Sequence, residues 1–171
     1  MLGFLKNRSF PVAVGLAALL FSAGCHRQQD EVHAQPMVPH QPIYSDTANA
    51  QADIQNALAK AASEKKRVIL DFGGNWCGDC QVLNIYFHQA PNDAILNANF
   101  VLVDVNIGHY DMNTDIADKY GVPLKKGVPA LAVLDASGNV LYSQRDSEFA
   151  NMRAMDPNSV TAFLNQWKPN S

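Results

Sequence analysis

Two cysteines separated by two residues, Cys77 and Cys80, are the part of the sequence best suited to chemistry. The apolar run 68–72 and two glycines precede them, and residues 81–89, rich in long apolar side chains, follow. This order predicts a buried strand, a tight turn and the N-terminus of a helix. There, unpaired backbone N–H groups and the helix dipole favour a thiolate on Cys77. Because a thiolate can attack a disulfide and a neighbouring thiol can release the adduct, the pair indicates a redox site.

The composition excludes several other classes of protein. The chain has 171 residues, enough for one domain with appendages, and its formal net charge is −3. Because a nucleic-acid surface is normally basic, no nucleic-acid partner is expected. Three cysteines, the close pair and the distant Cys25, are too few for a disulfide-stapled scaffold.

The first residues have the pattern of an export signal. Lys6 and Arg8 form a basic stretch, and the apolar run 10–21 that follows is too short to span a bilayer comfortably. Small residues then precede Cys25, so the segment resembles a bacterial lipoprotein signal, in which the cysteine becomes the lipidated first residue. We therefore expect residues 1–24 to be a signal peptide. An ordinary signal peptide with a chance cysteine is the alternative, and either would export the protein.

Residues 25–46 are expected to form a flexible tether, with the folded domain occupying residues 47–171. Three prolines recur at every third position of the tether without apolar periodicity, which favours an extended chain. Its three histidines have no cysteine or carboxylate partners at ligand spacing, so they are expected to be solvated. Because residue 26 is His26 rather than aspartate, the lipoprotein resemblance implies a periplasmic protein held at the outer membrane.

Hydrophobic periodicity predicts the elements on both sides of the cysteine pair. Helices are expected over 47–66 with Asp46 or Thr47 as N-cap, over 114–120 and from Asp156 onward, and strands over 68–72, 100–105, 130–134 and 140–143. This order predicts an α/β fold, a central mixed sheet with a parallel part and a C-terminal antiparallel hairpin, flanked by helices. The irregular segments 123–127 and 146–155 are expected to form a rim around the cysteine pair.

A group of residues around the pair resembles the motif of the thioredoxin superfamily. The residues that carry the resemblance stand in order along the chain: Asp71, Phe72, Trp76, Cys77, Gly78, Cys80, Val128 and Pro129. The resemblance covers about residues 47–167 and implies the thioredoxin fold. A Cys-x-x-Cys pair alone would be a weak signal, because zinc sites and haem attachment share it.

In the superfamily the first cysteine is exposed and the second is buried. The resemblance therefore implies that Cys77 attacks a client disulfide and that Cys80 resolves the mixed disulfide. Trp76 is expected to shield the pair with its ring, the alternative being simple core packing. Gly78 and Asp79 form the dipeptide between the cysteines. A carboxylate at residue 79 would compete with the Cys77 thiolate for the positive end of the helix, unless it points into water.

Asp71 is an acid inside an otherwise apolar predicted strand. The resemblance places it buried beneath Cys80, where desolvation raises its pKa and where it takes the Cys80 proton directly or through a water. A surface carboxylate at a strand end is the alternative. Thioredoxins often pair this acid with a lysine on the next strand. Residues 101–105 contain no lysine, and Leu102 is expected in its place.

The pair Val128 and Pro129 precedes a predicted strand. The resemblance implies a cis peptide bond between them, which turns the Val128 backbone toward Cys77. That backbone would bind substrate by offering strand-like hydrogen bonds to an extended client chain. The cis proline would also keep a metal-binding side chain away from the sulfurs. An ordinary trans proline at a strand start is the alternative.

The sequence thus predicts an exported, lipid-anchored thiol–disulfide oxidoreductase, a reductase or isomerase acting on cysteines of envelope proteins. Its partners would be client proteins with thiols or disulfides, an upstream electron donor or acceptor, and the membrane. No cofactor is expected beyond the redox-active disulfide, and no metal. A non-enzymatic copper carrier using the two sulfurs is the alternative, although only His88 stands near as a further ligand. Haem attachment would need a histidine where Gln81 stands.

Overall fold

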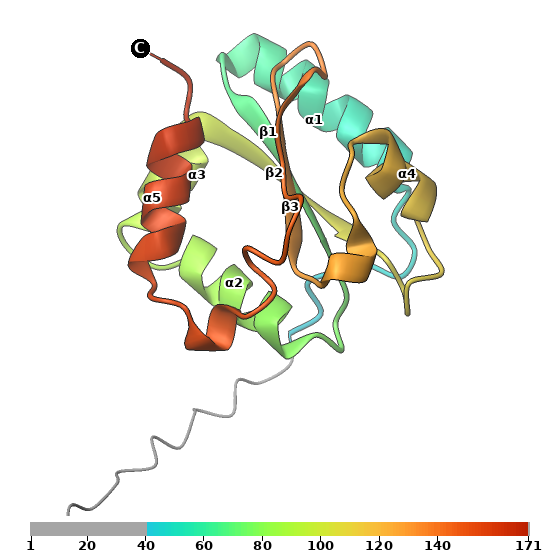
Figure 1. The fold of residues 1–171 in the computed structure, drawn as a ribbon. Coiled ribbons are helices and arrows are strands. Elements are labelled where there is room, and N and C mark those ends of the chain that lie inside the picture. Colours follow the sequence, from blue (N-terminus) through green and yellow to red (C-terminus); the bar gives the residue numbers. More distant parts are fainter. Residues whose placement is uncertain (1–40, 171) are drawn as a thin grey trace, which may run out of the picture. The chain divides into compact units, whose positions relative to one another are not determined.

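The computed structural model of the protein describes residues 41–170 (Figure 1). The predictions of a signal peptide over 1–24 and of a lipidated Cys25 lie outside the described residues, as does most of the predicted tether. Between residues 41 and 170 the chain forms a central sheet with helices on both faces.

The sheet has four strands in the order β2-β1-β3-β4. Their bounds are β1 Arg67–Gly73, β2 Phe100–Asn106, β3 Ala130–Leu134 and β4 Val140–Ser143. β1 pairs in parallel with β2 and antiparallel with β3, and β3 pairs antiparallel with β4. The predicted mixed sheet with a C-terminal hairpin is therefore confirmed. β1 and β3 lie at the centre and are buried almost throughout, as is expected of strands covered on both faces.

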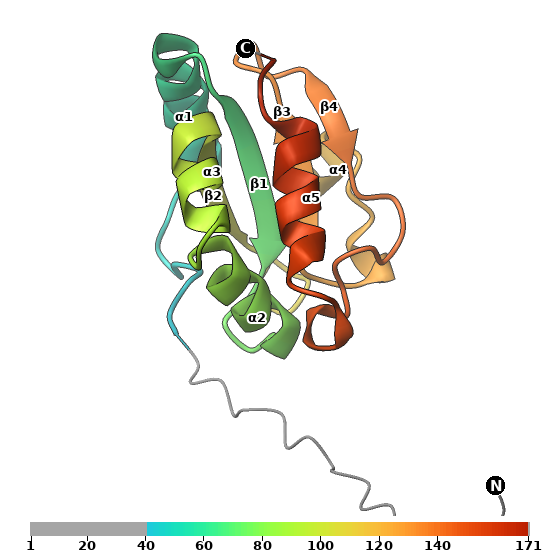
Figure 2. The ribbon, with the colours of Figure 1, turned by 90° about the vertical axis from the view of Figure 1, so that its left-hand side faces the viewer.

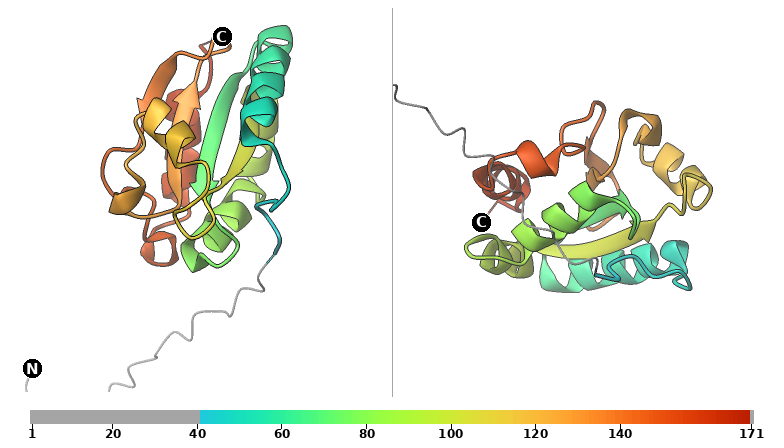
Figure 3. Two further views of the ribbon diagram at one scale, coloured as in Figure 1. Left: turned by 90° about the vertical axis from the view of Figure 1, so that its right-hand side faces the viewer. Right: turned by 90° about the horizontal axis from the view of Figure 1, so that it is seen from below.

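Two layers of helices cover the sheet. Their bounds are α1 Ala50–Glu64, α2 Gly78–Phe87, α3 Asn92–Asn99, α4 Thr114–Lys119 and α5 Asn158–Trp167, with short 3₁₀ turns η1 Leu124–Lys126 and η2 Met152–Ala154. α1 and α4 contribute to one hydrophobic cluster, and α2, α3 and α5 build the cluster on the opposite face (Figure 2). Figure 3 shows α1 running beside β2, at the edge of the sheet.

The first helix begins later than the sequence predicted. Neither Asp46 nor Thr47 is its N-cap; Asn49 is, and its side chain accepts a hydrogen bond of 3.0 Å from the Ala52 N–H. The segment 41–46 packs against the domain instead, because its Tyr44 is only 1% exposed. The packed part of the chain therefore starts before residue 47, where the sequence placed the boundary.

The remaining elements agree with the sequence pattern, with one addition. A second helix, α3, follows α2, over residues where the sequence pattern indicates a break at 91–93 and only a further helical turn through residue 97. The segment 146–155 contains η2. Met152 within it is fully buried in the hydrophobic cluster on the face of the sheet that α5 covers. None of the helices between residues 41 and 170 has the length and apolarity needed to cross a bilayer.

Candidate active site

The turn from β1 into α2 positions the cysteine pair. Cys77 is the N-cap of α2, and its Sγ accepts a hydrogen bond of 3.1 Å from the Cys80 N–H. The two cysteines form a disulfide, with their Cα atoms 5.2 Å apart. When the pair is reduced, an N–H group aimed at Cys77 Sγ stabilises negative charge on that sulfur. The structure therefore brings the predicted pair together at the N-terminus of a helix.

The two sulfurs differ in access, although less than the resemblance implied. Cys77 is 5% exposed and Cys80 is 0% exposed. The prediction that Cys77 is exposed is therefore wrong in degree, because the turn and the residues facing it cover most of its surface. Cys77 is still the only one of the two with any accessible area. A client sulfur can reach the pair only through it.

Val128 and Pro129 face the first cysteine, as predicted. The peptide bond between them is cis. The Val128 carbonyl oxygen lies 3.5 Å from Cys77 Sγ, and Val128 itself is 7% exposed. Backbone just before β3 is thus available beside the sulfur.

Asp71 is completely buried, so the alternative of a surface carboxylate is wrong. Burial raises the pKa of Asp71 well above its usual range, and the charge of Asp104 raises it further. A hydrogen bond from the Tyr44 hydroxyl to Asp71 Oδ2, 3.0 Å long, acts in the opposite direction. The other oxygen, Oδ1, has no hydrogen-bond partner within residues 41–170. Asp71 is therefore a buried acid with one oxygen held and one available for a proton.

Similarity to known proteins agrees with this geometry. A family model described as thioredoxin-like matches residues 49–136. The chain belongs to the thioredoxin-like family. The crystal structure of a disulphide isomerase from Xylella fastidiosa Temecula1 is similar over 74% of this chain and 96% of that one, with 31% sequence identity and a TM-score of 0.71.

Two further relatives of this thioredoxin-like chain have names that refer to thiol chemistry. The thiol:disulfide interchange protein DsbD of Pseudomonas fluorescens is 26% identical over 123 residues, which are 71% of this chain but 19% of that protein. A thioredoxin of Mycoplasma genitalium is 36% identical over 78 residues, 46% of this chain and 68% of the thioredoxin. With the Cys77–Cys80 disulfide, these similarities support the class of thiol–disulfide oxidoreductases.

The neighbour of Asp71 on the next strand is a second acid. The register of β1 and β2 pairs Asp71 with Asp104, whereas Leu102 lies opposite Ile69. The prediction that Leu102 takes the place of the family's lysine is therefore wrong. Desolvation raises the pKa of Asp104 to about 6, and His88 lowers it. This thioredoxin-like chain thus pairs the buried Asp71 with a second, half-buried carboxyl group.

Asp79 does not point into water. Its carboxylate accepts hydrogen bonds from Arg153 Nε at 3.2 Å, from Nη2 at 3.1 Å and from the Arg153 backbone N–H at 3.0 Å. The Asp79 side chain is only 13% exposed, and Arg153 also lies over Gly78. Arg153 comes from η2, so the predicted rim over 146–155 does border the site. Sequence reasoning missed Arg153, because nothing in an irregular segment marks one arginine among others.

The Trp76 side chain packs outward rather than into the core. It is 41% exposed, and its Nε1 donates a hydrogen bond of 2.6 Å to the Gly108 carbonyl oxygen. Its ring stacks on His109, with centroids 5.5 Å apart, and contacts Tyr110. The alternative of simple core packing is therefore wrong. The loop after β2 gives the site an exposed aromatic surface that the sequence analysis did not identify.

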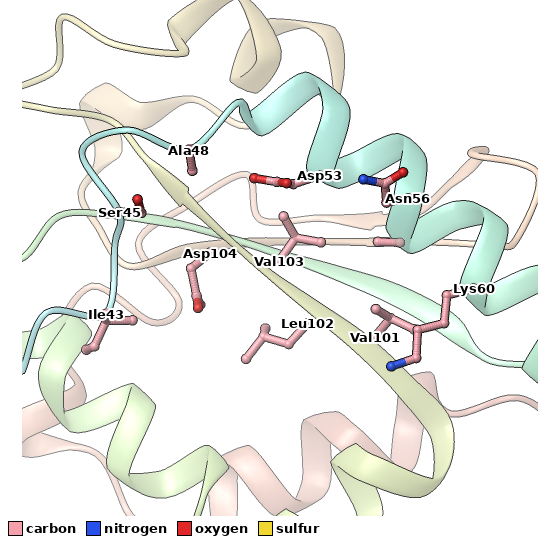
Figure 4. A pocket seen from close by; sticks show the side chains of 11 residues that line it. Ile43, Ser45, Ala48, Asp53, Asn56, Lys60, Val101, Leu102, Val103 and Asp104 are labelled. Carbon is pink, nitrogen blue, oxygen red and sulfur yellow. The ribbon is translucent and has the colours of Figure 1, made fainter.

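A groove of about 400 Å³ runs along the outer edge of β2 (Figure 4). Figure 4 shows its lining from the N-terminal segment, from α1 and from β2, with Asp104 among the labelled side chains. Between residues 41 and 170, no three histidine, cysteine, aspartate or glutamate side chains lie together as a metal site requires.

Proposed function

We propose that the protein is an exported protein-disulfide reductase or isomerase in which Cys77 attacks client disulfides and Cys80 resolves the mixed disulfide. The observation that carries the proposal is the asymmetry of the pair. Cys77 Sγ receives a helix N-terminal N–H and retains some accessible surface, whereas Cys80 is enclosed. The similarity to a disulphide isomerase over 96% of its chain supports the same class of reaction.

The first step begins with the reduced pair. The Cys77 thiolate attacks one sulfur of the client disulfide, so a bond forms between Cys77 Sγ and the client, and the other client sulfur leaves as a thiolate. The Cys80 N–H stabilises the attacking charge beforehand. The Val128 carbonyl, 3.5 Å from the sulfur, accepts a backbone N–H of the extended client. No proton transfer is needed in this step.

The second step releases the client. The Cys80 thiol gives its proton to the Asp71 carboxylate, and the resulting thiolate attacks Cys77 Sγ. The bond between Cys77 and the client breaks, the second client sulfur leaves as a thiolate, and the Cys77–Cys80 disulfide forms. The client has gained two electrons and the protein has lost two. In isomerisation a second thiol of the client attacks the client sulfur of the mixed disulfide before Cys80 reacts. Cys77 then leaves as a thiolate, so the pair is reduced again and the client has neither gained nor lost electrons.

The location is part of the proposal. A lipid on Cys25 and a tether would hold the domain in the periplasm at the outer membrane. Because the periplasm is kept oxidising, a reductase or isomerase there needs a partner that returns electrons to it. Fractionation of cells expressing the wild type and Cys25→Ser would test this. Unchanged processing and unchanged membrane association in the variant would contradict the lipoprotein assignment.

The activity is tested with reduced protein in two assays, insulin reduction and recovery of a client with scrambled disulfides. Cys80→Ser is expected to accumulate mixed disulfides through Cys77, and Cys77→Ser to form none. Adducts formed mainly through Cys80 would reverse the assignment. Absence of turnover, together with stoichiometric copper on the reduced pair, would favour the copper carrier instead.

A further inference from the structure

The N-terminal segment 41–46 is tied to the residues that flank the cysteine pair. Gln81, directly after Cys80, donates through Nε2 to the Gln41 carbonyl oxygen at 3.0 Å and accepts from the Gln41 N–H at 2.9 Å. Asn75, two residues before Cys77, donates to the Tyr44 carbonyl oxygen at 2.7 Å and accepts from the Tyr44 N–H at 2.9 Å. Two reciprocal pairs of hydrogen bonds therefore fix the backbone at Gln41 and at Tyr44.

The Tyr44 side chain reaches from this segment into the active site. It is 1% exposed, and its hydroxyl donates to Asp71 Oδ2 at 3.0 Å. A Cβ atom added to Gly73 would fall within 3.0 Å of both the Tyr44 hydroxyl oxygen and Cys80 Sγ. The hydroxyl group that binds the Asp71 carboxyl group therefore lies beside the resolving sulfur at Gly73, in a space that only a residue without a side chain leaves open.

We infer that Tyr44 is a positioning residue of the active site, whose hydroxyl holds the Asp71 carboxyl in place to accept the proton that Cys80 releases during resolution. This inference rests on the proposed function. The hydroxyl occupies Oδ2, so the proton goes to Oδ1, which has no other partner in the described part of the chain. Tyr44 gives up no proton itself, because burial and the charge of Asp71 raise the pKa of Tyr44 well above its usual range.

The surroundings of Asp71 explain why such a donor is needed. The titratable groups that act on it are Tyr44 from the N-terminal segment and Asp104 from β2. Cys80 from α2 lies beside Tyr44 at Gly73, and His88 acts on Asp104. The buried side chains that α1 and β3 contribute to the same cluster are apolar. Burial and Asp104 both favour the neutral carboxyl, which cannot accept a proton. The Tyr44 hydrogen bond favours the carboxylate, so it keeps a buried acid usable as a base.

Tyr44→Phe tests the inference, because it removes the hydroxyl and keeps the buried ring. The reduced protein is mixed with an aromatic disulfide that releases one coloured thiolate on Cys77 attack and a second on Cys80 resolution. The second phase is expected to slow by about tenfold or more at neutral pH, as for loss of a hydrogen bond to a charged acceptor. The first phase should be unchanged. The rate of the second phase increases with pH, and in Tyr44→Phe this increase should occur at higher pH than in the wild type.

Three comparison variants separate positioning from packing. Tyr120→Phe alters another buried tyrosine of the same cluster and should leave both phases unchanged. Asp104→Asn removes the opposing charge and should move the pH profile to lower pH, the reverse of Tyr44→Phe. In an Asp71→Asn background, Tyr44→Phe should slow resolution no further. A wild-type pH profile in Tyr44→Phe, or an equal loss in both backgrounds, would overturn the inference.

The ionisation of Asp71 provides a readout that does not need turnover. Carboxyl carbon resonances of aspartate-labelled reduced protein, assigned with Asp71→Asn, report its titration directly. Tyr44→Phe should move that titration to higher pH, and an unmoved titration overturns the inference even if the enzyme is active. If the wild type neither reduces insulin nor recovers a scrambled client, the proposed function fails, and the titration still decides whether Tyr44 acts on Asp71.

Discussion

Replacing Asp104 with asparagine should stabilise the protein at neutral pH. Desolvation raises the pKa of Asp104 from 3.8 to about 6. Between those values the folded protein keeps a proton that the unfolded chain has released, so the free energy of unfolding falls as pH rises and levels off above about 6. A shift of about two units corresponds to about 3 kcal/mol, at about 1.4 kcal/mol per unit. Asparagine keeps the shape of the side chain and has no charge to desolvate.

Urea unfolding of the wild type and Asp104→Asn across this pH range measures the effect. The difference in unfolding free energy between the two proteins should be small near pH 4, grow toward pH 6 and then stay constant. Asp53→Asn is the matched control, since Asp53 lines the same groove from α1 and is exposed. Parallel curves for wild type and Asp104→Asn between pH 4 and pH 6 would refute the reasoning, as would an equal effect in the control.

Four further substitutions address the site itself. Asp71→Asn should slow resolution by about 10²-fold or more, the usual contribution of a general base, while initial attack is unaffected; equal loss in both steps of a stopped-flow assay would indicate a packing role. Asp79→Asn leaves the Arg153 cation unbalanced beside Gly78, the residue after Cys77, and should make the protein a stronger oxidant, whereas Arg153→Gln should make it more reducing; equilibration with glutathione measures both, and shifts of the same sign would contradict the ion-pair argument. Gly73→Ala places a Cβ atom within 3.0 Å of a buried hydroxyl and a sulfur and should cost about 1–3 kcal/mol of stability, measured by urea unfolding; an unchanged midpoint would show that the space is not tightly filled.

The sequence predicted the fold well because its signals are local. An apolar β-branched run buries itself on both faces of a sheet. The acid and proline at 156–157 directly precede α5, which begins at Asn158, two residues after the predicted start. β3 and β4 have the predicted bounds, since a turn rich in Asp, Ser, Gly and Asn separates two short apolar runs. The burial of Asp71 and of Cys80 could be predicted from the resemblance, because their positions along β1 and α2 determine it.

The misplaced residues depend on register or on contacts between distant segments. Leu102 and Asp104 differ by two positions on one strand face, and only the pairing of β1 with β2 shows that Asp104 stands opposite Asp71. Asp79 and Arg153 are 74 positions apart, and no periodicity connects them. Tyr44 lies in a proline-containing stretch whose composition is that of a linker. It is buried because the amide side chains of Asn75 and Gln81 bind the backbone of this segment, and the composition of the segment does not indicate those contacts.

The N-terminal segment therefore contacts the active site in two ways that a flexible linker would not. It contributes the hydroxyl that contacts Asp71, and it is fastened by side chains on both sides of the cysteine pair. Asp104 and Tyr44 act on Asp71 with opposite sign, one favouring the neutral acid and the other the carboxylate. A general base works best when its pKa lies near the working pH. In this chain Asp104 and the Tyr44 hydroxyl act on Asp71 in place of the lysine that many thioredoxins pair with this acid. Replacing Asp104 or Tyr44 should therefore shift the pH dependence of resolution while the fold is kept.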